Sequence, residues 1–260
     1  MSSEVMDAFW RAPPMARTLA SAILITSMGI YFGPLPSTWF YFTEDRLFRL
    51  PPEIWRLASN FLLSGPKLSI VMDPYFVFQY LGELETTNPR FPTKEAALWY
   101  LMTVGGFIII LNRAFLGGGF FLQALLLALC YTSVQDQRGM KANFFFFQVP
   151  AQTVPYCMIL VGMLSSQSPA AVPTQLSGIV AAHLYDFLTR LWPEFGGGPN
   201  LLPAPGFLSR LVTTPRVFQR EYGTAIRGGG GQTSGSSTGA SAGSVLPDSW
   251  KTRGSGHRLG

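Results

Sequence analysis

Residues 98–135 read LWYLMTVGGFIIILNRAFLGGGFFLQALLLALCYTSVQ, an apolar run in which Arg113 is the only charged side chain. A helix that crosses the hydrocarbon core of a membrane, about 30 Å thick, needs about 20 apolar residues. Helix is the expected conformation there, because lipid offers no water to bond exposed backbone N–H and C=O groups. Arg113 and the glycines at 117–119 interrupt the run, so it predicts two membrane helices joined by a tight hairpin.

Comparable gaps in the charge distribution flank this run. No charged residue lies between Thr18 and Thr43, and Asp186 is the only one between Lys141 and Arg190. We therefore expect an all-α polytopic membrane protein with a six-transmembrane-helix core. Dividing the gaps at glycine, proline and polar positions places the spans at about 18–36, 58–80, 97–112, 119–134, 144–165 and 172–191.

The composition favours a membrane protein over two other classes. Charged residues make up 13% of the 260 residues, whereas soluble domains average about 25%. The 21 Phe and 6 Trp are too many for a chain that is disordered throughout. A soluble bundle of buried helices is the remaining alternative, but such helices normally show a polar face and these mostly do not.

The basic residues indicate an orientation. More lysines and arginines lie near the spans on the side that holds both termini than on the opposite side. Basic residues concentrate on the cytosolic side of membrane proteins, so both termini are expected in the cytosol. The first apolar run is too long for a signal peptide and lacks a clear cleavage site, which predicts an uncleaved first span.

Two segments depart from the pattern of short helical hairpins. Residues 36–59 are dense in aromatic side chains, which predicts a loop partly embedded in the membrane. After a membrane domain at 1–195, we expect a membrane-proximal segment at 196–227 and a disordered tail at 228–260. The tail begins GGGGQTSGSSTGASAGS, which cannot bury enough apolar surface to fold, and ends in the distinct motif WKTRGSGHRLG.

Trp55, Arg56 and Asn60 lie just before the second span and form the first candidate site. An arginine beside an apolar segment can extend its guanidinium to lipid headgroups, while tryptophan anchors at the membrane interface. Two interpretations stay open for these residues. They form either a wedge that perturbs or thins lipid locally, or an ordinary interfacial anchor.

The sixth span carries the second candidate site. Gly178 and Ala182 are four residues apart, which creates a smooth face that lets two helices approach closely. His183 and Asp186 are three residues apart and are expected to share a face, where polar groups are costly unless paired or hydrated. His183 then has either a catalytic or proton-relay role, or a structural role within a hydrogen bond.

An intramembrane serine protease would need a serine within hydrogen-bonding reach of His183. The first serine of the fourth span is Ser133, about 20 Å from the end where a nucleophile would be needed. We therefore expect no catalytic residues and no enzymatic activity. A transporter built on Arg113, His183 and Asp186 is a further alternative, which requires these side chains to meet at one depth.

Cys130 and Cys157, the two cysteines of the chain, both fall inside predicted spans. Thiols in that environment usually pack as small apolar groups. No cluster of cysteine and histidine has the spacing of metal ligands, so we expect no disulfide, no metal site and no cofactor.

Several motifs together resemble the Derlin family, the rhomboid-like pseudoproteases of the endoplasmic reticulum. The resemblance covers about residues 9–215. The residues that carry it are Phe9-Trp-Arg-Ala-Pro-Pro14 with Arg17 and Thr18, Ile54-Trp55-Arg56-Leu57 through Asn60-Phe61-Leu62, Gly82-Glu83-Leu84-Glu85, Asn143-Phe144-Phe145, and Gly178 to Phe187 followed by Pro193.

The resemblance implies a rhomboid-like core in the endoplasmic reticulum membrane, with a partly embedded first luminal loop and both termini cytosolic. Trp55 and Arg56 match the family's Trp-Arg motif, thought to distort the bilayer. Gly178 and Ala182 match its glycine motif, with alanine in place of the second glycine. The implied function is non-proteolytic: retrotranslocation of misfolded proteins in ER-associated degradation, by local membrane thinning and recruitment of a AAA ATPase.

The end of the chain is similar to the SHP box, with which some Derlins recruit that ATPase, of the valosin-containing type. The matching residues are Gly254, Gly256, Arg258 and Leu259, and Trp250 stands further upstream than the family's usual aromatic residue. A flexible linker raises the local concentration of a weakly bound partner. Further implied partners are an ER ubiquitin-ligase complex, misfolded luminal or membrane substrates, the lipid bilayer and other subunits of a homo- or hetero-oligomer. No nucleic acid is expected.

Overall fold

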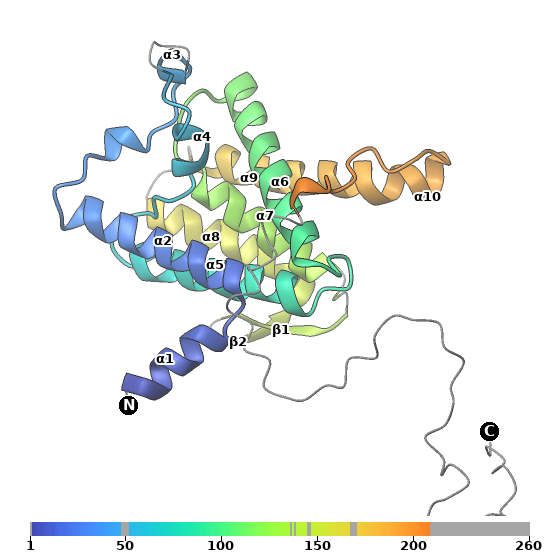
Figure 1. The fold of residues 1–260 in the computed structure, drawn as a ribbon, viewed down its shortest axis with the longest axis horizontal. Helices are drawn as coiled ribbons and strands as arrows, with labels where there is room; N and C mark the ends of the chain where they lie inside the picture. Colours follow the sequence, from blue (N-terminus) through green and yellow to red (C-terminus); the bar gives the residue numbers. More distant parts are fainter. Residues whose placement is uncertain are drawn as a thin grey trace, which may run out of the picture. The chain divides into compact units, whose positions relative to one another are not determined.

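The computed structural model describes residues 2–47, 52–135, 137, 139–144, 147–166 and 171–208. These residues form a mostly helical domain (Figure 1). In chain order the elements are α1 (Ser2–Arg11), α2 (Pro14–Tyr31), the 3₁₀ turn η1 (Ser37–Trp39), α3 (Glu44–Leu47), α4 (Arg56–Ser59), α5 (Ser69–Thr86), α6 (Lys94–Phe115), α7 (Leu122–Gln135), β1 (Lys141–Phe144), β2 (Phe147–Pro150), the 3₁₀ turn η2 (Ala151–Thr153), α8 (Val154–Ser166), α9 (Ala171–Asp186), the π-helical turn η3 (Phe187–Leu191) and α10 (Trp192–Gly196).

Six of these helices, α2 and α5 to α9, fall at the positions of the six predicted spans. The prediction of a mostly helical chain is confirmed. The prediction that all six cross a membrane stays a prediction. In the part of the chain that the structure describes, a single helix, Lys94–Phe115, is both long and apolar enough to span a membrane. Shorter apolar helices lie at Leu122–Gln135 and Ala151–Leu164.

The predicted start of the fifth span at residue 144 is wrong. Lys141–Phe144 and Phe147–Pro150 form an antiparallel strand pair instead, so the chain is not purely α-helical. Helical structure begins only at Ala151, immediately after Pro150. Proline lacks a backbone N–H and is favoured in the first turn of a helix, which is where Pro155 stands in α8. Pro150 and Pro155 thus fix the residue at which the helix of the fifth predicted span begins.

The helix of the second span also begins later than predicted. It starts at Ser69 rather than at about residue 58, and only the short helix α4 lies before it. Pro66 disfavours helical backbone at Gly65, and Lys67 has a φ of 61°, in the left-handed region. A continuous helix cannot pass through this segment, which instead forms a buried connection described below.

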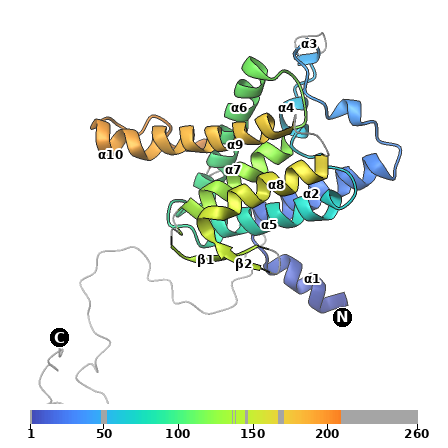
Figure 2. The ribbon, with the colours of Figure 1, turned by 180° about the vertical axis from the view of Figure 1, so that it is seen from behind.

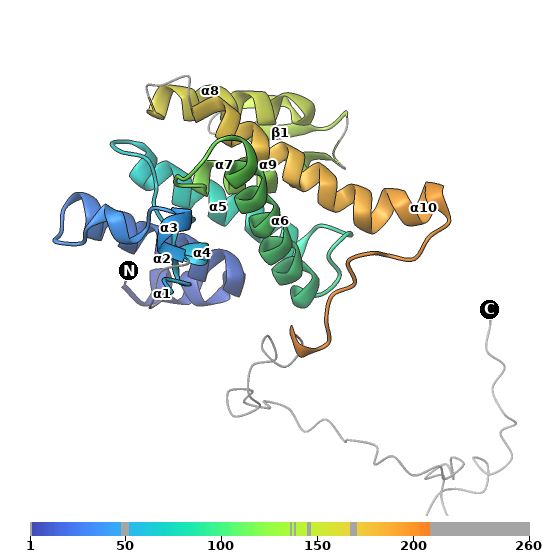
Figure 3. The ribbon, with the colours of Figure 1, turned by 90° about the horizontal axis from the view of Figure 1, so that it is seen from above.

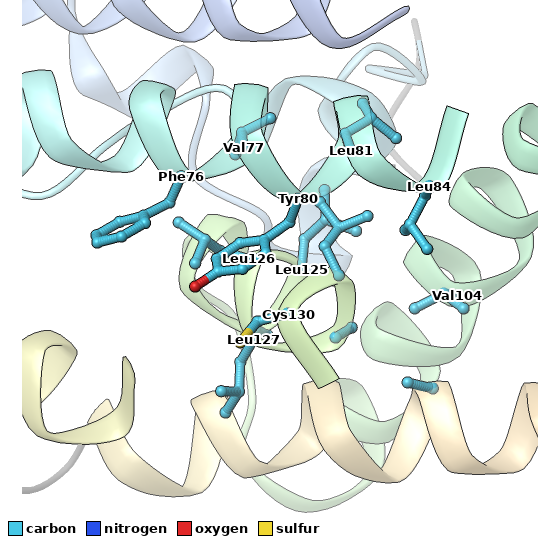
Figure 4. Packing of buried hydrophobic residues seen from close by; sticks show 14 of the residues in the cluster. Phe76, Val77, Tyr80, Leu81, Leu84, Val104, Leu125, Leu126, Leu127 and Cys130 are labelled. Carbon is cyan, nitrogen blue, oxygen red and sulfur yellow. The ribbon is translucent and has the colours of Figure 1, made fainter. Parts of the chain in front are cut away.

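α7 is the central helix of the fold. It packs against α5, α6, α8 and α9, and nearly all of its side chains are buried. Inside a membrane, such helix contacts act through close packing rather than through the exclusion of water. Figure 4 shows the layer between α5 and α7, where the labelled side chains of α5 are Phe76, Val77, Tyr80, Leu81 and Leu84.

α7 and α9 approach each other closely at Gly178. A Cβ atom at this position would lie 1.9 Å from the backbone oxygen of Ala124 and 2.7 Å from its carbonyl carbon. Both separations are far shorter than the optimal contact between non-bonded atoms. As the sequence predicts, the glycine lets two helices meet, and Ala182 on the next turn of α9 is also buried.

We expect Gly178→Ala to lower the Tm of the full chain in detergent, because α7 and α9 must separate to admit the methyl group, at a cost of about 1–3 kcal/mol. Gly106→Ala on α6 is the matched control, since nothing lies within 4 Å of a Cβ atom there. Alanine is favoured over glycine in a helix by about 1 kcal/mol, so this control should keep or raise the Tm. Equal melting temperatures for both variants would contradict the close contact.

Candidate functional site

Arg56 is the centre of the first candidate site, and it points into the protein. Its side chain is only 1% exposed. Its Nη1 donates hydrogen bonds to the backbone oxygens of Thr38, at 2.6 Å, and of Tyr41, at 2.5 Å. Its Nε forms a short ion pair with the carboxylate of Glu53. One guanidinium thus holds two separate parts of the loop between α2 and α5 together.

The expectation that Arg56 reaches lipid headgroups is therefore wrong. The physical reason is that a buried guanidinium is stable once its charge and its N–H groups are paired, and the loop offers backbone oxygens that α-helices would have used internally. The neighbouring side chains do face outward. Trp55 is 56% exposed and Ile54 is 61% exposed. The two members of the Trp-Arg pair thus have different roles. Trp55 lies at the surface, whereas Arg56 is buried and holds the loop together.

Asn60 joins this loop to the helical core. It is fully buried, and its Nδ2 donates to the backbone oxygen of Arg56 at 2.6 Å. Its own backbone oxygen accepts a hydrogen bond from the N–H of Phe121, just before α7, at 3.1 Å. Close by along both segments, Phe42 and Gly119 exchange two backbone hydrogen bonds of 3.2 Å. The loop that presents Trp55 is thus fixed to the start of α7.

The second candidate site lies on α9, where one prediction is wrong. Asp186 is buried, whereas His183 is exposed, so the two do not share a face. A helix turns by about 100° per residue, so positions four apart stay nearly in line. Gly178, Ala182 and Asp186 therefore form one buried stripe, and His183 lies beside it. The proton-relay interpretation of His183 with Asp186 loses its geometric basis.

Asp186 is held by a polar cluster at one end of the core. Its Oδ1 lies 3.4 Å from Nη1 of Arg90, and its Oδ2 lies 3.1 Å from Nη2 of Arg190. Gln135 completes the cluster, because its Nε2 donates to Asp186 at 3.2 Å while its Oε1 accepts from Arg90 at 2.9 Å. The carboxylate thus connects the ends of α7 and α9 with the segment before α6.

Sequence reasoning missed a second buried carboxylate, Asp73 in α5, which is 4% exposed. Its Oδ2 accepts hydrogen bonds from Ser64 Oγ at 2.7 Å, from Gln123 Nε2 at 2.8 Å and from the N–H of Gly65 at 3.2 Å. Asp73 thus joins the connection before α5 to the first turn of α7. An isolated carboxylate inside an apolar run is the signal that would have found it, because such a group must be paired.

In the structure, the motif at Gly82–Glu85 contacts the motif that precedes the first predicted span, although the two are far apart in the sequence. Glu85 Oε2 accepts from the N–H groups of Met15, at 3.1 Å, and Ala16, at 3.3 Å, at the start of α2. A carboxylate is favoured there, because the first N–H groups of a helix have no partner within it. A Cβ atom at Gly82 would lie 3.7 Å from Ala16, so the glycine admits α2 at contact distance.

The serine considered as a nucleophile has another partner. The hydroxyl of Ser133 forms a short hydrogen bond to the carboxylate of Glu83. No hydrogen bond joins His183 to a serine within the ranges described above. Nor do the transporter candidates converge, because Arg113 pairs with Glu44 at 2.9 Å, whereas Asp186 pairs with Arg90 and Arg190.

The structure describes both cysteines, but it does not describe the tail motif. Cys130 and Cys157 are free thiols. Among the described side chains, no group of three His, Cys, Asp or Glu residues is placed to hold a metal ion. The predicted ATPase-binding residues lie outside the described ranges, and they are Trp250, Gly254, Gly256, Arg258 and Leu259.

A comparison with known protein families covers most of the chain. A model of the Der1-like family matches residues 12–206, three quarters of the chain and both candidate sites. The chain belongs to the Der1-like family. The predicted resemblance to the Derlins is thus confirmed for residues 12–206, and the match ends before the tail motif.

Curated relatives in the family cover most of the chain. The protein named Derlin-1 from Homo sapiens is 26% identical over 220 residues, which are 82% of this chain and 85% of the relative. Derlin-1 from Drosophila melanogaster is 24% identical over 205 residues, or 77% and 81%. The probable derlin-2 homolog from Dictyostelium discoideum is 24% identical over 221 residues, or 82% and 84%.

The different environments of Trp55 and Arg56 predict different effects of substitution. Arg56→Ala leaves the partly buried carboxylate of Glu53 and two carbonyls without their partner, and we expect it to destabilise the full chain by about 3 kcal/mol. Trp55→Ala removes an exposed side chain and should change stability by less than about 0.5 kcal/mol. Thermal unfolding in detergent measures both. Equal losses of stability would show that the pair acts as one unit.

Proposed function

We propose that this chain is a multi-pass protein of the endoplasmic reticulum membrane that assists the export of misfolded proteins for degradation without cleaving them. The observation that carries the proposal is an apolar helix on the outside of the core that is too short for a normal bilayer. Family membership supports the general assignment, since the Derlins to which the motifs are similar act in this process.

That helix is α8, which runs across the outer side of the core in Figure 2. Its outward side chains are apolar, with Tyr156 72% exposed and Leu160 and Leu164 59% and 69% exposed. The apolar stretch extends from Ala151 to Leu164, and polar residues follow it in the sequence. Fourteen helical residues span about 21 Å, compared with about 30 Å of hydrocarbon.

A bilayer that surrounds α8 must adapt to this difference. Thinning costs only fractions of a kcal/mol per ångström of mismatch, so the protein can impose it locally. Moving a polar segment of a misfolded protein through hydrocarbon costs several kcal/mol for each unsatisfied group. A thinner layer shortens that path, which is the mechanical basis of the proposed activity.

The loop held by Arg56 supplies a second element of the mechanism. Arg56 and Asn60 fix the loop to the core, so Trp55 is presented from a rigid support. An exposed tryptophan on a rigid support perturbs lipid order more than one on a mobile segment, because it cannot move to relieve the mismatch. Of the two interpretations of the sequence, this favours the wedge over a passive anchor.

The six helices are proposed to cross the membrane with both termini in the cytosol. The polar contacts support an alternating arrangement, because they gather at two ends of the core. The ends of α7 and α9 meet the segment before α6 through Asp186. At the other end, Arg113 in the last turn of α6 pairs with Glu44 of α3, in the connection after α2. Basic residues then place the Asp186 end on the cytosolic side.

The tail is proposed to recruit the force that completes extraction. Its final residues are similar to the SHP box, and its Gly/Ser linker holds them close to the membrane domain. A hexameric AAA ATPase of the valosin-containing type is the proposed motor. A ubiquitin ligase and further copies of this or related chains are the proposed partners within the membrane.

We expect Trp55→Ala to slow the degradation of a misfolded membrane client in a chase experiment without lowering the amount of the folded variant. Trp192→Ala is the matched control, because Trp192 is also partly exposed, at 41%, but lies after α9 rather than in the loop. The control should degrade the client at the normal rate. Normal degradation with Trp55→Ala would remove the wedge from the mechanism.

The recruitment proposal is tested with the full chain in detergent. We expect the chain to capture the purified ATPase, and the double variant Gly254→Ala with Gly256→Ala to lose most of that binding. The variant should keep the Tm of the parent chain, because both glycines lie far outside the membrane domain in the sequence. Equal capture by both proteins would assign recruitment to another partner.

A further inference from the structure

A cavity of about 380 Å³ lies beside the Asp186 cluster. It is bounded by the segment before α6, by α6 itself, by the end of α9 and by residues 200–204. Of the two candidate sites of the sequence analysis, only Ala182 and Asp186 line this cavity. Its walls combine cationic and aromatic side chains, so its chemistry can be examined for a ligand.

The charged groups of the cavity leave it positive. Arg90 and Arg190 both line it, and Asp186 is the acidic residue that faces them. Arg190 binds Asp186 through Nη2, while 45% of its side-chain surface is exposed. A guanidinium has five N–H donors, so one bond to a carboxylate leaves others accessible at the cavity mouth. The accessible donors of Arg190 are well suited to phosphate oxygens, and the nearby charge of Arg90 adds to the positive potential.

The remaining walls are aromatic and amphipathic. Tyr100 and Tyr185 pack edge to face with ring centroids 5.0 Å apart. Trp99 donates its indole N–H to the backbone oxygen of Leu202 at 3.1 Å. In this way residues 200–204 form a strap across the cavity. Figure 3 shows the chain turning back from the end of α10 toward α6, where this strap lies.

We propose that this cavity binds the phosphorylated headgroup of an anionic phospholipid from the cytosolic leaflet. The inference rests on the proposed function in one respect, namely that the helices span a membrane with the Asp186 end in the cytosol. Basic pockets between membrane helices on that side are a recurrent form of lipid-headgroup site. Tryptophan and tyrosine are favoured at the same depth, where one end of the side chain is apolar and the other hydrated.

The path for the acyl chains supports a lipid over a soluble phosphate. Met102 lies three residues after Trp99 and is therefore on the same side of α6, where it is 51% exposed. An exposed apolar side chain thus lies one turn beyond the cavity wall, further along the proposed membrane span. In the proposed complex, the phosphate binds the arginine side chains and the acyl chains lie against α6.

Binding would also stabilise the strap. The strap is held by the bond from Trp99 and by the N–H of Leu201, which donates to the backbone oxygen of Leu188 at 3.4 Å. Trp99 and Leu202 both line the cavity, so a headgroup inside it would stabilise the contact between them.

The test uses the purified full chain in lipid-free detergent, with dioctanoyl phosphatidylinositol 4-phosphate as the probe and its Kd measured by native mass spectrometry. Arg190→Gln should weaken binding by about tenfold or more, since it removes charge-assisted hydrogen bonds to phosphate. Arg190→Lys should retain part of the affinity. Arg113→Gln is the matched control, because Arg113 is a comparably exposed arginine, paired with Glu44, at the other end of the core, and it should bind normally.

Each outcome supports or overturns the proposal. Selective loss with Arg190→Gln supports it, provided that the Tm without lipid is unchanged. No binding by the parent chain, or equal loss with Arg113→Gln, overturns it. Equal affinity for soluble inositol 1,4-bisphosphate would assign the site to a free phosphate ligand and overturn the lipid assignment. Resistance of the chain to carbonate extraction from membranes tests the membrane proposal separately, so the two failures can be distinguished.

Discussion

The contact between Gly178 and the backbone of Ala124 is the constraint on which the arrangement of the core depends. Because no side chain separates them, α7 and α9 lie close enough for the rest of the stripe on α9 to face α7. That stripe ends at Asp186, whose carboxylate then reaches Gln135 at the end of α7. A methyl group at one position would thus displace a polar cluster two turns away, since the helix transmits the shift rigidly.

Polar groups inside the apolar core follow a common rule. Asp73, Asp186 and Arg56 are each buried, and each has a partner from a segment that is distant in the sequence. An apolar contact tolerates small rotations, whereas a buried charge is stable only in the geometry that pairs it. These three residues therefore fix the register of neighbouring helices and loops, while the aliphatic side chains fill the space between them.

The sequence predicts the helices well because long intervals without charge leave few alternatives, as residues 98–135 illustrate. It also predicts the close approach at Gly178, since a face of small residues on an apolar helix lets a second helix pack closely against it. It does not reveal that Arg56 turns inward, because the carbonyls that attract it belong to Thr38 and Tyr41 and become available only when the loop folds. The strands before α8 were missed for a related reason: aromatic runs suit membrane helix and strand alike, and the pairing partner decides between them.

The shortness of α8 has a consequence for where the protein resides. Bilayers differ in thickness along the secretory pathway, from about 27 Å of hydrocarbon in the endoplasmic reticulum to about 32 Å or more at the plasma membrane. In the proposed arrangement, the stretch of α8 that ends at Leu164 faces lipid and is strained least in the thinnest of these membranes. The dimensions of this one helix would then favour retention in the early pathway.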